Sequence, residues 1–424
     1  MKKVKLLQLV VLLLISGLIG YYFGINNVKV SWQNYKPSLE IINKETPASA
    51  NVDFSMFWNV WGKLETDYYD KTKLDPTKML NGAIQGMIGS LGDPYTMYLP
   101  PVQNTSFKEG MAGQFSGIGA ELGMKDNQII VIAPLTGSPA EAAGMKAGDF
   151  ILKVNGVATT NQALNDVVNT IRGPKGTSVT LTILHKDSQT PQDIKIVRDT
   201  ITVKSVDGWV KDVKDIGGIK VPDNQAGKIA YVRLSQFGDA TNNDWQATIS
   251  KIFLQMQSEN DIKGLVLDLR NNPGGYLTDA VFIASEFLPV GTKVVSEDPC
   301  TQDCVLSVQR KGLLTDPKIK IIVLINGGSA SASEIVSGAL RDNKTNGESR
   351  ALLVGDKSFG KGTVQEADDL GNGAGLHITI AKWLTPNGTW VHGKGLMPDI
   401  EVALDPKDPS HDTQLEKAVL ELLK

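Results

Sequence analysis

The spacing of hydrophobic residues divides the chain into three segments. Between 52 and 90, apolar residues recur every three or four positions, so we predict a small helical module there. From 113 to 203, short alternating stretches that are typical of strands surround one amphipathic helix at 163–172. From 204 onward, apolar strands alternate with helices. This alternation predicts an α/β core with a mostly buried sheet that ends in a helix at 413–423.

The third segment gives the clearest individual elements. Its predicted strands are Lys228 to Leu234, Gly264 to Leu269 and Ile319 to Asn326, which are rich in Val, Ile and Leu. Helices are predicted at 244–258 and 277–288. The whole chain is therefore divided into an anchor (1–29), a linker (30–51), the helical module (52–112), a second domain (113–203) and the core (204–424).

The N-terminus has the charge pattern of a membrane anchor. Lys2, Lys3 and Lys5 precede the apolar run Leu6 to Ile25, which is long enough to span a bilayer. The lysines place the N-terminus in the cytoplasm and the rest of the chain outside the membrane. A cleaved signal peptide is the competing interpretation, which is disfavoured because the run is long and no cleavage site of small residues follows it closely. The polar stretch from Val28 to Ala50 is interpreted as a tether.

Composition narrows the class of protein. A chain of 424 residues with 41% hydrophobic and 21% charged residues is typical of a globular protein with two or three domains. A net charge of -3 gives no reason to expect nucleic-acid binding. The four histidines are too far apart for a metal cluster, so neither a metal nor another cofactor is expected. Cys300 and Cys304 either form a disulfide or remain two free thiols.

The chemistry-bearing stretch is Ile325-Asn326-Gly327-Gly328-Ser329-Ala330-Ser331-Ala332-Ser333-Glu334, with Phe359-Gly360-Lys361-Gly362 downstream. A buried strand, a glycine turn and a helix start would expose a serine hydroxyl beside backbone N–H groups that can stabilise an oxyanion. A lysine can serve as the base for such a serine if burial lowers its pKa. The lysine loop lacks the spacing of a P-loop, so nucleotide binding is disfavoured.

These two stretches belong to a set of six motifs that resembles the carboxyl-terminal processing peptidases, a family of serine–lysine endopeptidases that carry a PDZ domain. The resemblance runs from about Phe54 to the C-terminus. The other motifs are Leu91-Gly92-Asp93-Pro94-Tyr95-Thr96, Phe115-Ser116-Gly117-Ile118-Gly119, Leu267-Asp268-Leu269-Arg270-Asn271-Asn272-Pro273-Gly274-Gly275 and Gly393-Lys394-Gly395-Leu396-Met397-Pro398. The resemblance implies an α/β multidomain protein with a PDZ domain at 113–203 and a crotonase/ClpP-like protease core.

The resemblance also implies the catalytic roles. Ser331, the middle serine, is expected to be the nucleophile, Lys361 the general base and Gln365 the residue that orients the lysine. Backbone N–H groups of Gly274, with Gly275 as the alternative, and of Ala332 are expected to form the oxyanion hole. Glu334 and Asp342 are interpreted as structural.

Protein or peptide C-termini are the expected substrates, because PDZ domains capture chain ends by adding a strand beside a carboxylate-binding loop. The loop would contain Gly117, Ile118 and Gly119. The side-chain pocket is expected on the helix, and its residues are Leu164, Val168 and Ile171, with Arg172 as a link to the core. In the family, the N-terminal helical module helps dimerisation, so a homodimer is a further expectation.

Two other functions remain as rivals. A non-catalytic PDZ scaffold would have no need of the lysine, and an acyl-CoA enzyme of the crotonase type would not need a PDZ domain or an anchor. The chain departs from the family pattern at Lys344 to Glu348, a polar insertion with an Asn-Gly turn. A surface loop that leaves the site intact is expected there.

Overall fold

The computed structural model describes residue 16 and residues 28–33, 36–41, 52–125, 128–135, 137–162, 164–186, 188–299, 304–345, 347–405, 407–408 and 410–424. The chain divides into two compact units. One comprises residues 1–100 and 369–376, and the other comprises residues 101–368 and 377–424.

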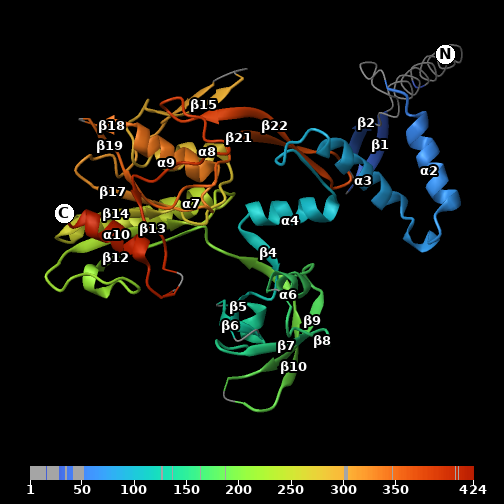
Figure 1. Cartoon of the computed structure of the whole chain (residues 1–424), viewed down its shortest axis with the longest axis horizontal. Coiled ribbons are helices and arrows are strands. Elements are labelled where there is room, and N and C mark those ends of the chain that lie inside the picture. The colour runs from blue at the N-terminus through green and yellow to red at the C-terminus, as the bar shows by residue number, and fades with distance from the viewer. Residues whose placement is uncertain are drawn as a thin grey trace, which may run out of the picture. The chain divides into compact units, whose positions relative to one another are not determined.

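The first unit contains residues 52–100 of the helical module predicted at 52–112, whose last part lies in the second unit. Its helices are α2 (Ser55–Asp67) and α3 (Pro76–Gly89), with the short helix η1 (Lys71–Lys73) between them, as Figure 1 shows in blue. The side chain of Asp75 caps α3 by accepting from two N–H groups of its first turn. Neither helix has a buried side chain, although both carry a row of apolar residues. Strand β3 (Met97–Leu99) ends the module.

The N-terminal segment differs in part from the expectation. Most of the predicted anchor lies outside the described residues, and within the described residues no helix is long and apolar enough to cross a membrane. The expected tether stays a prediction, and its first part contains an antiparallel hairpin of β1 (Val28–Gln33) and β2 (Lys36–Ile41). A polar composition does not prevent pairing when the backbone groups of two strands satisfy one another.

The second unit begins with α4 (Pro101–Met111), which leads into the expected PDZ domain. Strand β4 (Gln114–Gly117) enters this domain and pairs with β11 (Asp199–Thr202), which leaves it. Between them lies a sheet of order β10-β9-β7-β6-β5, with β8 (Val157–Ala158) beside β7. Its strands are β5 (Ala120–Lys125), β6 (Gln128–Pro134), β7 (Phe150–Val154), β9 (Ser178–Leu184) and β10 (Gln192–Val197).

The two helices of this domain are α5 (Pro139–Ala142) and α6 (Leu164–Ile171), the latter at the predicted position. Val167 and Ile171 of α6 are buried against the sheet, where they pack with the alternating buried residues of β9. The domain thus has a hydrophobic core of its own.

The core, residues 204–424, is built on a six-stranded sheet of order β12-β13-β14-β17-β20-β23. Its first pair is antiparallel and the rest are parallel. The strands are β12 (Val206–Asp212), β13 (Lys228–Leu234), β14 (Ile262–Asp268), β17 (Ile321–Ile325), β20 (Leu352–Gly355) and β23 (Ile400–Glu401). The three strands predicted from the sequence are therefore adjacent in space.

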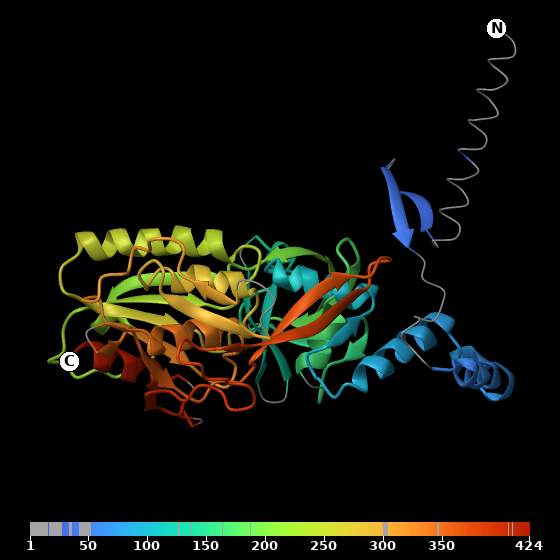
Figure 2. The ribbon, with the colours of Figure 1, turned by 90° about the horizontal axis from the view of Figure 1, so that it is seen from above.

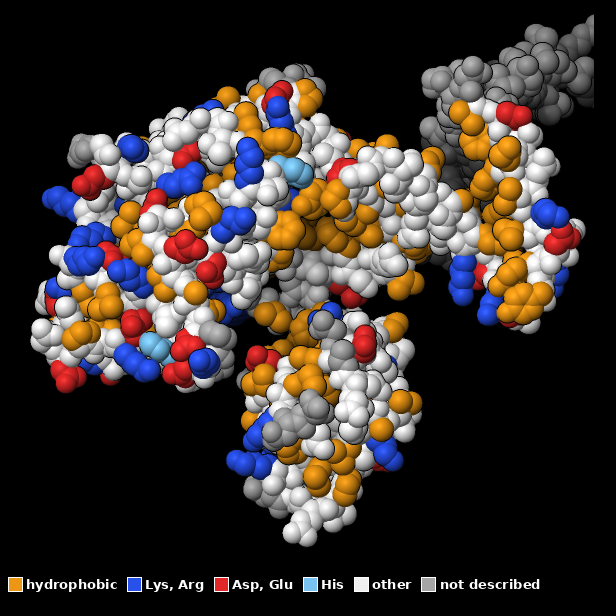
Figure 3. All heavy atoms as spheres, in the orientation of Figure 1, with side chains coloured by type: hydrophobic (Ala, Val, Ile, Leu, Met, Phe, Trp, Pro, Cys, Tyr) orange, Lys and Arg blue, Asp and Glu red, His pale blue; other side chains and the backbone are white. Residues whose placement is uncertain are grey.

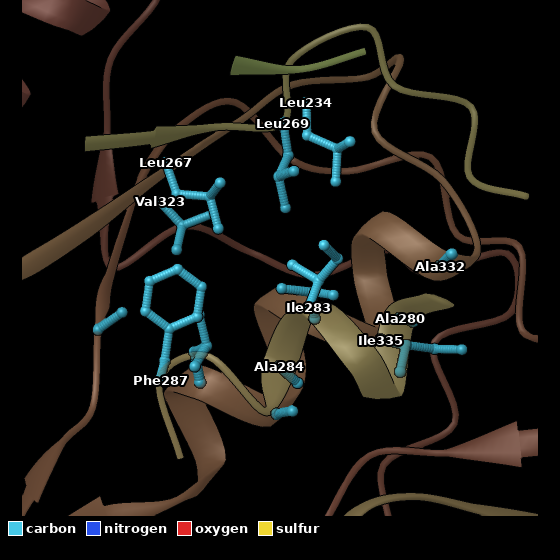
Figure 4. Packing of buried hydrophobic residues seen from close by; sticks show 14 of the residues in the cluster. Leu234, Leu267, Leu269, Ala280, Ile283, Ala284, Phe287, Val323, Ala332 and Ile335 are labelled. Atoms are coloured by element: carbon cyan, nitrogen blue, oxygen red, sulfur yellow. The ribbon is translucent and has the colours of Figure 1, made fainter. Parts of the chain in front are cut away.

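Both faces of this sheet are covered, which explains why its strands read as continuous apolar runs. Helix α7 (Thr241–Ser258) covers one face together with α8 (Leu277–Ala284) and α9 (Ala332–Asp342), and α10 (Thr413–Leu422) covers the other. Figure 2 shows α7 and α10 on opposite sides of the strands. Figure 4 shows Leu267 and Val323 of the sheet pointing toward Ile283 and Phe287.

A smaller sheet of order β16-β15-β22-β21 adjoins the core. Its strands are β15 (Lys293–Asp298), β16 (Val305–Ser307), β21 (Thr363–Asp369) and β22 (Gly375–Leu384), and β3 pairs with β22. Cys304, just before β16, is disulfide-bonded, and Cys300 lies outside the described residues. The polar insertion forms a short hairpin of β18 (Lys344–Thr345) and β19 (Glu348–Ser349) after α9.

Candidate active site

Ser331 lies at the junction of a strand and a helix, as the sequence predicts. Strand β17 ends at Ile325, and α9 begins at Ala332. Ser331 has φ 53° and ψ -115°, a conformation that is strained for a residue with a side chain. Backbone strain of this kind is found where a structure holds a side chain at a functional position.

The three serines of the motif have different surroundings. Ser329 and Ser333 are fully buried. The hydroxyl of Ser329 donates to the Leu269 carbonyl at 2.8 Å, and that of Ser333 donates to the Asn272 carbonyl at 2.9 Å. Ser331, in contrast, is half-buried. The middle serine is therefore the one whose hydroxyl can meet a substrate.

The glycine turn after β14 lies directly against Ser331. The N–H of Ala330 donates to the Asn272 carbonyl at 3.0 Å, which joins the turn to the serine motif. A Cβ placed on Gly274 would lie 2.8 Å from the Ser331 Cβ and 2.9 Å from the Ala332 nitrogen. Gly274 also has φ +95°, so two independent constraints require glycine there.

The N–H groups at this junction differ in their hydrogen bonding. The N–H of Gly274 donates to the Asn272 side-chain oxygen at 2.9 Å. Within the described residues, we find no acceptor for the N–H groups of Gly275 and Ala332. The Ala332 N–H is thus available as an oxyanion donor. Which glycine supplies the second donor stays a prediction, and Gly275 has the unengaged N–H in this structure.

One buried carboxylate joins the serine and lysine motifs. Glu334 has no exposed surface. Its Oε2 accepts from the Ser331 N–H and from the Lys361 N–H, both at 2.9 Å. Its Oε1 accepts from the Ser358 hydroxyl at 2.5 Å and from the Gly360 N–H at 2.7 Å. The carboxylate therefore fixes the serine and lysine segments to one another. The structural role expected for Glu334 from the sequence is thus more specific than the sequence shows, because the contacts it supports are those of the site.

Aromatic residues hold the lysine loop from its other side. The indole N–H of Trp383 donates to the Lys361 carbonyl at 3.0 Å, and that of Trp390 donates to the Gly362 carbonyl at 2.9 Å. The Lys361 side chain is half-buried. Burial and the nearby Lys361 charge lower the pKa of His377. The loop is thus a rigid support for a partly desolvated lysine.

Gln365 lies on β21, four residues after the lysine. Its side-chain nitrogen donates to the hydroxyls of Thr363 at 2.8 Å and Thr379 at 3.1 Å. The amide is therefore fixed in orientation within this sheet. Its expected role in orienting Lys361 stays a prediction.

The structure gathers six of the seven expected peptide-binding residues around one cavity of about 210 Å³ in the PDZ domain. They are Gly117, Ile118, Gly119, Val168, Ile171 and Arg172, accompanied by Phe115, Ala120 and Leu122. Leu164 instead packs on the domain core. Gly119 cannot carry a side chain, because its Cβ would lie 2.4 Å from the Ser138 Cβ.

A larger cavity of about 750 Å³ adjoins this pocket and shares Phe115 and Arg172 with it. It is lined by α4, β4 and the segment 235–241 of the core. The guanidinium of Arg172 lies over the Phe115 ring, 5.4 Å from its centre. Sequence reasoning missed Phe115 as a wall residue, because β4 is too short to show a pattern. No group of metal-ligating side chains is found among the described residues.

Comparison with known proteins agrees with this geometry. The model of peptidase family S41 matches residues 228–402, a PDZ domain model matches 130–184, and the model of the activating protease CtpB N-terminal domain matches 14–101. A carboxy-terminal-processing protease of Bartonella bacilliformis is 41% identical over 86% of this chain and 79% of its own length. The chain belongs to the carboxy-terminal-processing proteases of peptidase family S41. It is a serine-type endopeptidase with a PDZ domain.

Other relatives extend the comparison. A CtpA-like serine protease of Staphylococcus aureus is 38% identical over 85% of this chain, which spans 66% of that relative. The crystal structure of an S41 protease from Bacteroides fragilis has a TM-score of 0.53, with 15% identity over 89% of this chain and 99% of that one. That likeness shows a common fold.

We predict that Glu334→Gln lowers kcat about a hundredfold with little change in secondary structure. A carboxamide nitrogen cannot accept from the N–H groups that bind the carboxylate. The serine and lysine segments are then no longer joined by a shared hydrogen-bond acceptor. The measurement is the cleavage of an unstructured fluorescent protein, with circular dichroism as the check on folding.

The matched control for this prediction is Asp342→Asn. Asp342 is a carboxylate on the same helix that accepts from Thr385 and Asn387, away from the serine. Full activity of Glu334→Gln, or an equal loss in both variants, would show that Glu334 has no special role.

Proposed function

We propose that this protease cleaves protein substrates near their C-terminus with a serine–lysine site, while its PDZ domain holds the substrate tail and an N-terminal helix anchors it to the membrane. The observation that carries the catalytic part is the Glu334 carboxylate, which accepts from the backbones of both Ser331 and Lys361. The half-buried Ser331 and the half-buried Lys361 are thereby fixed relative to one another by the hydrogen bonds of Glu334, which we call the Glu334 frame.

The reaction follows from these positions. The neutral amine of Lys361 takes the proton from the Ser331 hydroxyl as its oxygen bonds to the scissile carbonyl carbon. The resulting ammonium gives that proton to the leaving amine, and the C–N bond breaks. A water molecule then attacks the acyl-enzyme, with Lys361 again accepting and returning one proton. Gln365 is proposed to orient the amine without adding a charge that would raise its pKa.

The oxyanion is stabilised by the N-terminus of α9 in this proposal. The Ala332 N–H is the first donor, and a glycine of the turn, Gly274 or Gly275, supplies the second. Removal of one such donor typically costs about a hundredfold or more in rate. The Gly274 N–H would have to leave the Asn272 side chain in order to act, whereas the Gly275 N–H is already unengaged.

We predict that Ser331→Ala and Lys361→Ala each reduce cleavage of an unstructured protein by about a thousandfold or more while the thermal midpoint stays close to that of the parent protein. Lys361→Arg should be equally inactive, because a guanidinium does not deprotonate near neutral pH.

The controls for the serine are its two neighbours. Ser329→Ala and Ser333→Ala remove buried hydroxyls that bond to backbone carbonyls, so they should cost stability more than chemistry. If Ser331→Ala were active and one of the neighbouring variants inactive, the assignment of Ser331 as the nucleophile would be wrong.

The PDZ groove is proposed to capture the tail as an added strand beside β5, with the substrate carboxylate at the loop 117–119. We predict that Val168→Asp raises the KM for a tailed protein at least about tenfold, since a carboxylate in the groove repels the chain end. Val157→Asp changes an exposed residue elsewhere in the domain and is the matched control.

Cleavage of a short peptide separates recruitment from regulation in the same Val168→Asp protein. Unchanged peptide cleavage means that the groove only recruits, and faster or slower cleavage means that it also inhibits or activates the core. If Val168→Asp cleaves the tailed protein as well as Val157→Asp does, the groove is not the capture site.

The N-terminal segment is proposed to anchor the chain and to place the protease outside the cytoplasm, with the module 52–100 pairing with a second copy. Support comes from the flanking lysines, from the match to the CtpB N-terminal domain model and from exposed apolar side chains on α2 and α3. Those side chains include Met56 at 74%, Trp58 at 61% and Met87 at 66% exposure. Figure 3 shows hydrophobic side chains along the surface of this unit.

We predict that removal of residues 1–29 releases the protease from membranes as a homodimer, and that Trp58→Glu with Met87→Glu converts it to a monomer by sedimentation. If the truncated protein is released but has the same mass with and without the two substitutions, the anchor is supported and this dimer surface is excluded. A chain that stays soluble with residues 1–29 intact would exclude the anchor.

A further inference from the structure

Two helices of the core begin at the glycine turn beside Ser331 and at the segment that pairs with that turn. Helix α8 starts at Leu277, with Tyr276 as its N-cap just after Gly275, and α7 starts after the segment 235–240. The Phe237 N–H donates to the Gly274 carbonyl at 3.0 Å, and the Tyr276 N–H donates to the Phe237 carbonyl at 3.2 Å. The relative position of the two helix starts therefore fixes the glycine turn.

A buried polar pair joins these helix starts. The side-chain nitrogen of Asn242 on α7 donates to Asp279 Oδ1 on α8 at 2.9 Å. Asp279 is 5% exposed. Its other oxygen, Oδ2, and the Asn242 side-chain oxygen are both buried without a hydrogen-bond partner. Two buried acceptors left over from one pair are costly, and neither can satisfy the other.

A single proton resolves both orphaned atoms. A protonated carboxyl group has one O–H donor, and a carboxamide oxygen is an acceptor. With the proton on Oδ2 donated to the Asn242 side-chain oxygen, the acid and the amide would be joined by two hydrogen bonds in a closed ring. We propose that Asp279 is a positioning residue that acts in its neutral form, donating to Asn242 so that the ring holds the starts of α7 and α8 and hence the oxyanion turn. The positioning role rests on the proposed serine–lysine mechanism.

The surroundings of the pair favour the neutral acid. Burial raises the pKa of Asp279 to about 6, the Asn242 hydrogen bond acts in the opposite direction, and the charge of Asp239 raises it again. Tyr276 also faces the pair, and it stays neutral because burial and its bond to Asp239 raise its pKa to about 12.

Besides α7, the described elements that pack on α8 include α9, β15 and the sheet strands β14 and β17. Arg310 also lies over the Phe282 ring of α8, 4.0 Å from its centre, and its charge is paired with Glu286. Two carboxylates of α9 are engaged elsewhere, Glu334 by the catalytic loops and Asp342 by Thr385. Strand β15 carries the charged residues Lys293 and Glu297. Neither of them contributes to the raised pKa of Asp279. Among the described residues, Asp239 is therefore the charged group that raises the pKa of Asp279.

The sign of the pH dependence follows from the raised pKa. The unfolded chain ionises Asp279 near its ordinary value of 3.8, whereas the folded protein holds the proton until about 6. The stabilising contribution of the pair is complete below pH 3.8 and is lost as the pH rises through 6. Above that pH the ring opens, and the turn loses part of its support.

The test compares Asp279→Asn with the parent enzyme between pH 4.5 and 8. An amide at this position forms the same ring with Asn242 but cannot ionise. We expect the smallest Tm difference near pH 4.5 and a Tm for Asp279→Asn that exceeds the parent's by about 3 °C more at pH 8 than at pH 4.5. The kcat of Asp279→Asn relative to the parent should rise from about 1 at pH 5 to at least threefold at pH 8, since the Lys361 titration cancels in the ratio.

Two controls accompany this comparison. Asp279→Leu leaves Asn242 without any partner, so it should lower the Tm at every pH. Asp239→Asn removes the neighbouring charge and should shift the midpoint of the stability change to lower pH.

The outcomes separate the two proposals. A Tm difference that does not depend on pH would overturn the neutral acid, whatever the activity shows. A pH-dependent Tm difference with a constant kcat ratio would keep the acid–amide ring and overturn its positioning role. If Ser331→Ala is active, the proposed serine–lysine mechanism is wrong. The Tm comparison still shows whether Asp279 and Asn242 form the acid–amide ring.

Discussion

The structure of the site depends on one buried carboxylate. Glu334 is fully desolvated, and removing a charge from water is unfavourable unless hydrogen bonds replace the lost hydration. Its four donors come from the Ser331, Ser358, Gly360 and Lys361 positions, so the carboxylate is satisfied only when the serine and lysine segments lie together. The need to satisfy this buried charge therefore constrains Ser331 and Lys361, which are separated in the sequence, to lie in one site.

A second set of contacts connects this frame to the PDZ domain. Helix α4 leads into the PDZ domain, and its C-terminus touches the segment 236–239. The Asp239 N–H donates to the Met111 carbonyl at 2.9 Å, and the Gln236 side chain donates to the Gly110 carbonyl at 3.0 Å. A Cβ on Gly238 would lie 2.1 Å from the Met111 oxygen, so the approach requires glycine. Because the same segment pairs with the oxyanion turn, it gives the peptide-binding domain a direct physical connection to the proposed oxyanion donors.

The sequence predicts this architecture well where the signal is local and less well where it depends on contacts. The strands of the parallel sheet are continuous apolar runs because both faces are buried, and β13 has the predicted bounds. The serine and lysine are recognisable from their motifs. The partners of Glu334 are not predictable, because the lysine N–H lies 27 residues away in sequence. Likewise, helical periodicity identifies the inner face of α6 but does not tell that Leu164 packs on the core while Val168 reaches the cavity.

Ser329 and Ser333 are buried on either side of Ser331, and Glu334 accepts from the Ser331 N–H, so Ser331 should be the reactive serine. The most direct measurement is to react the folded protease with a fluorophosphonate and to locate the adduct by peptide mass spectrometry. If Ser331 is the nucleophile, the native protein should carry a single adduct, on Ser331, and the unfolded protein should carry none. An adduct on Ser329 or Ser333, or no adduct on a native protein that cleaves substrates, would contradict it.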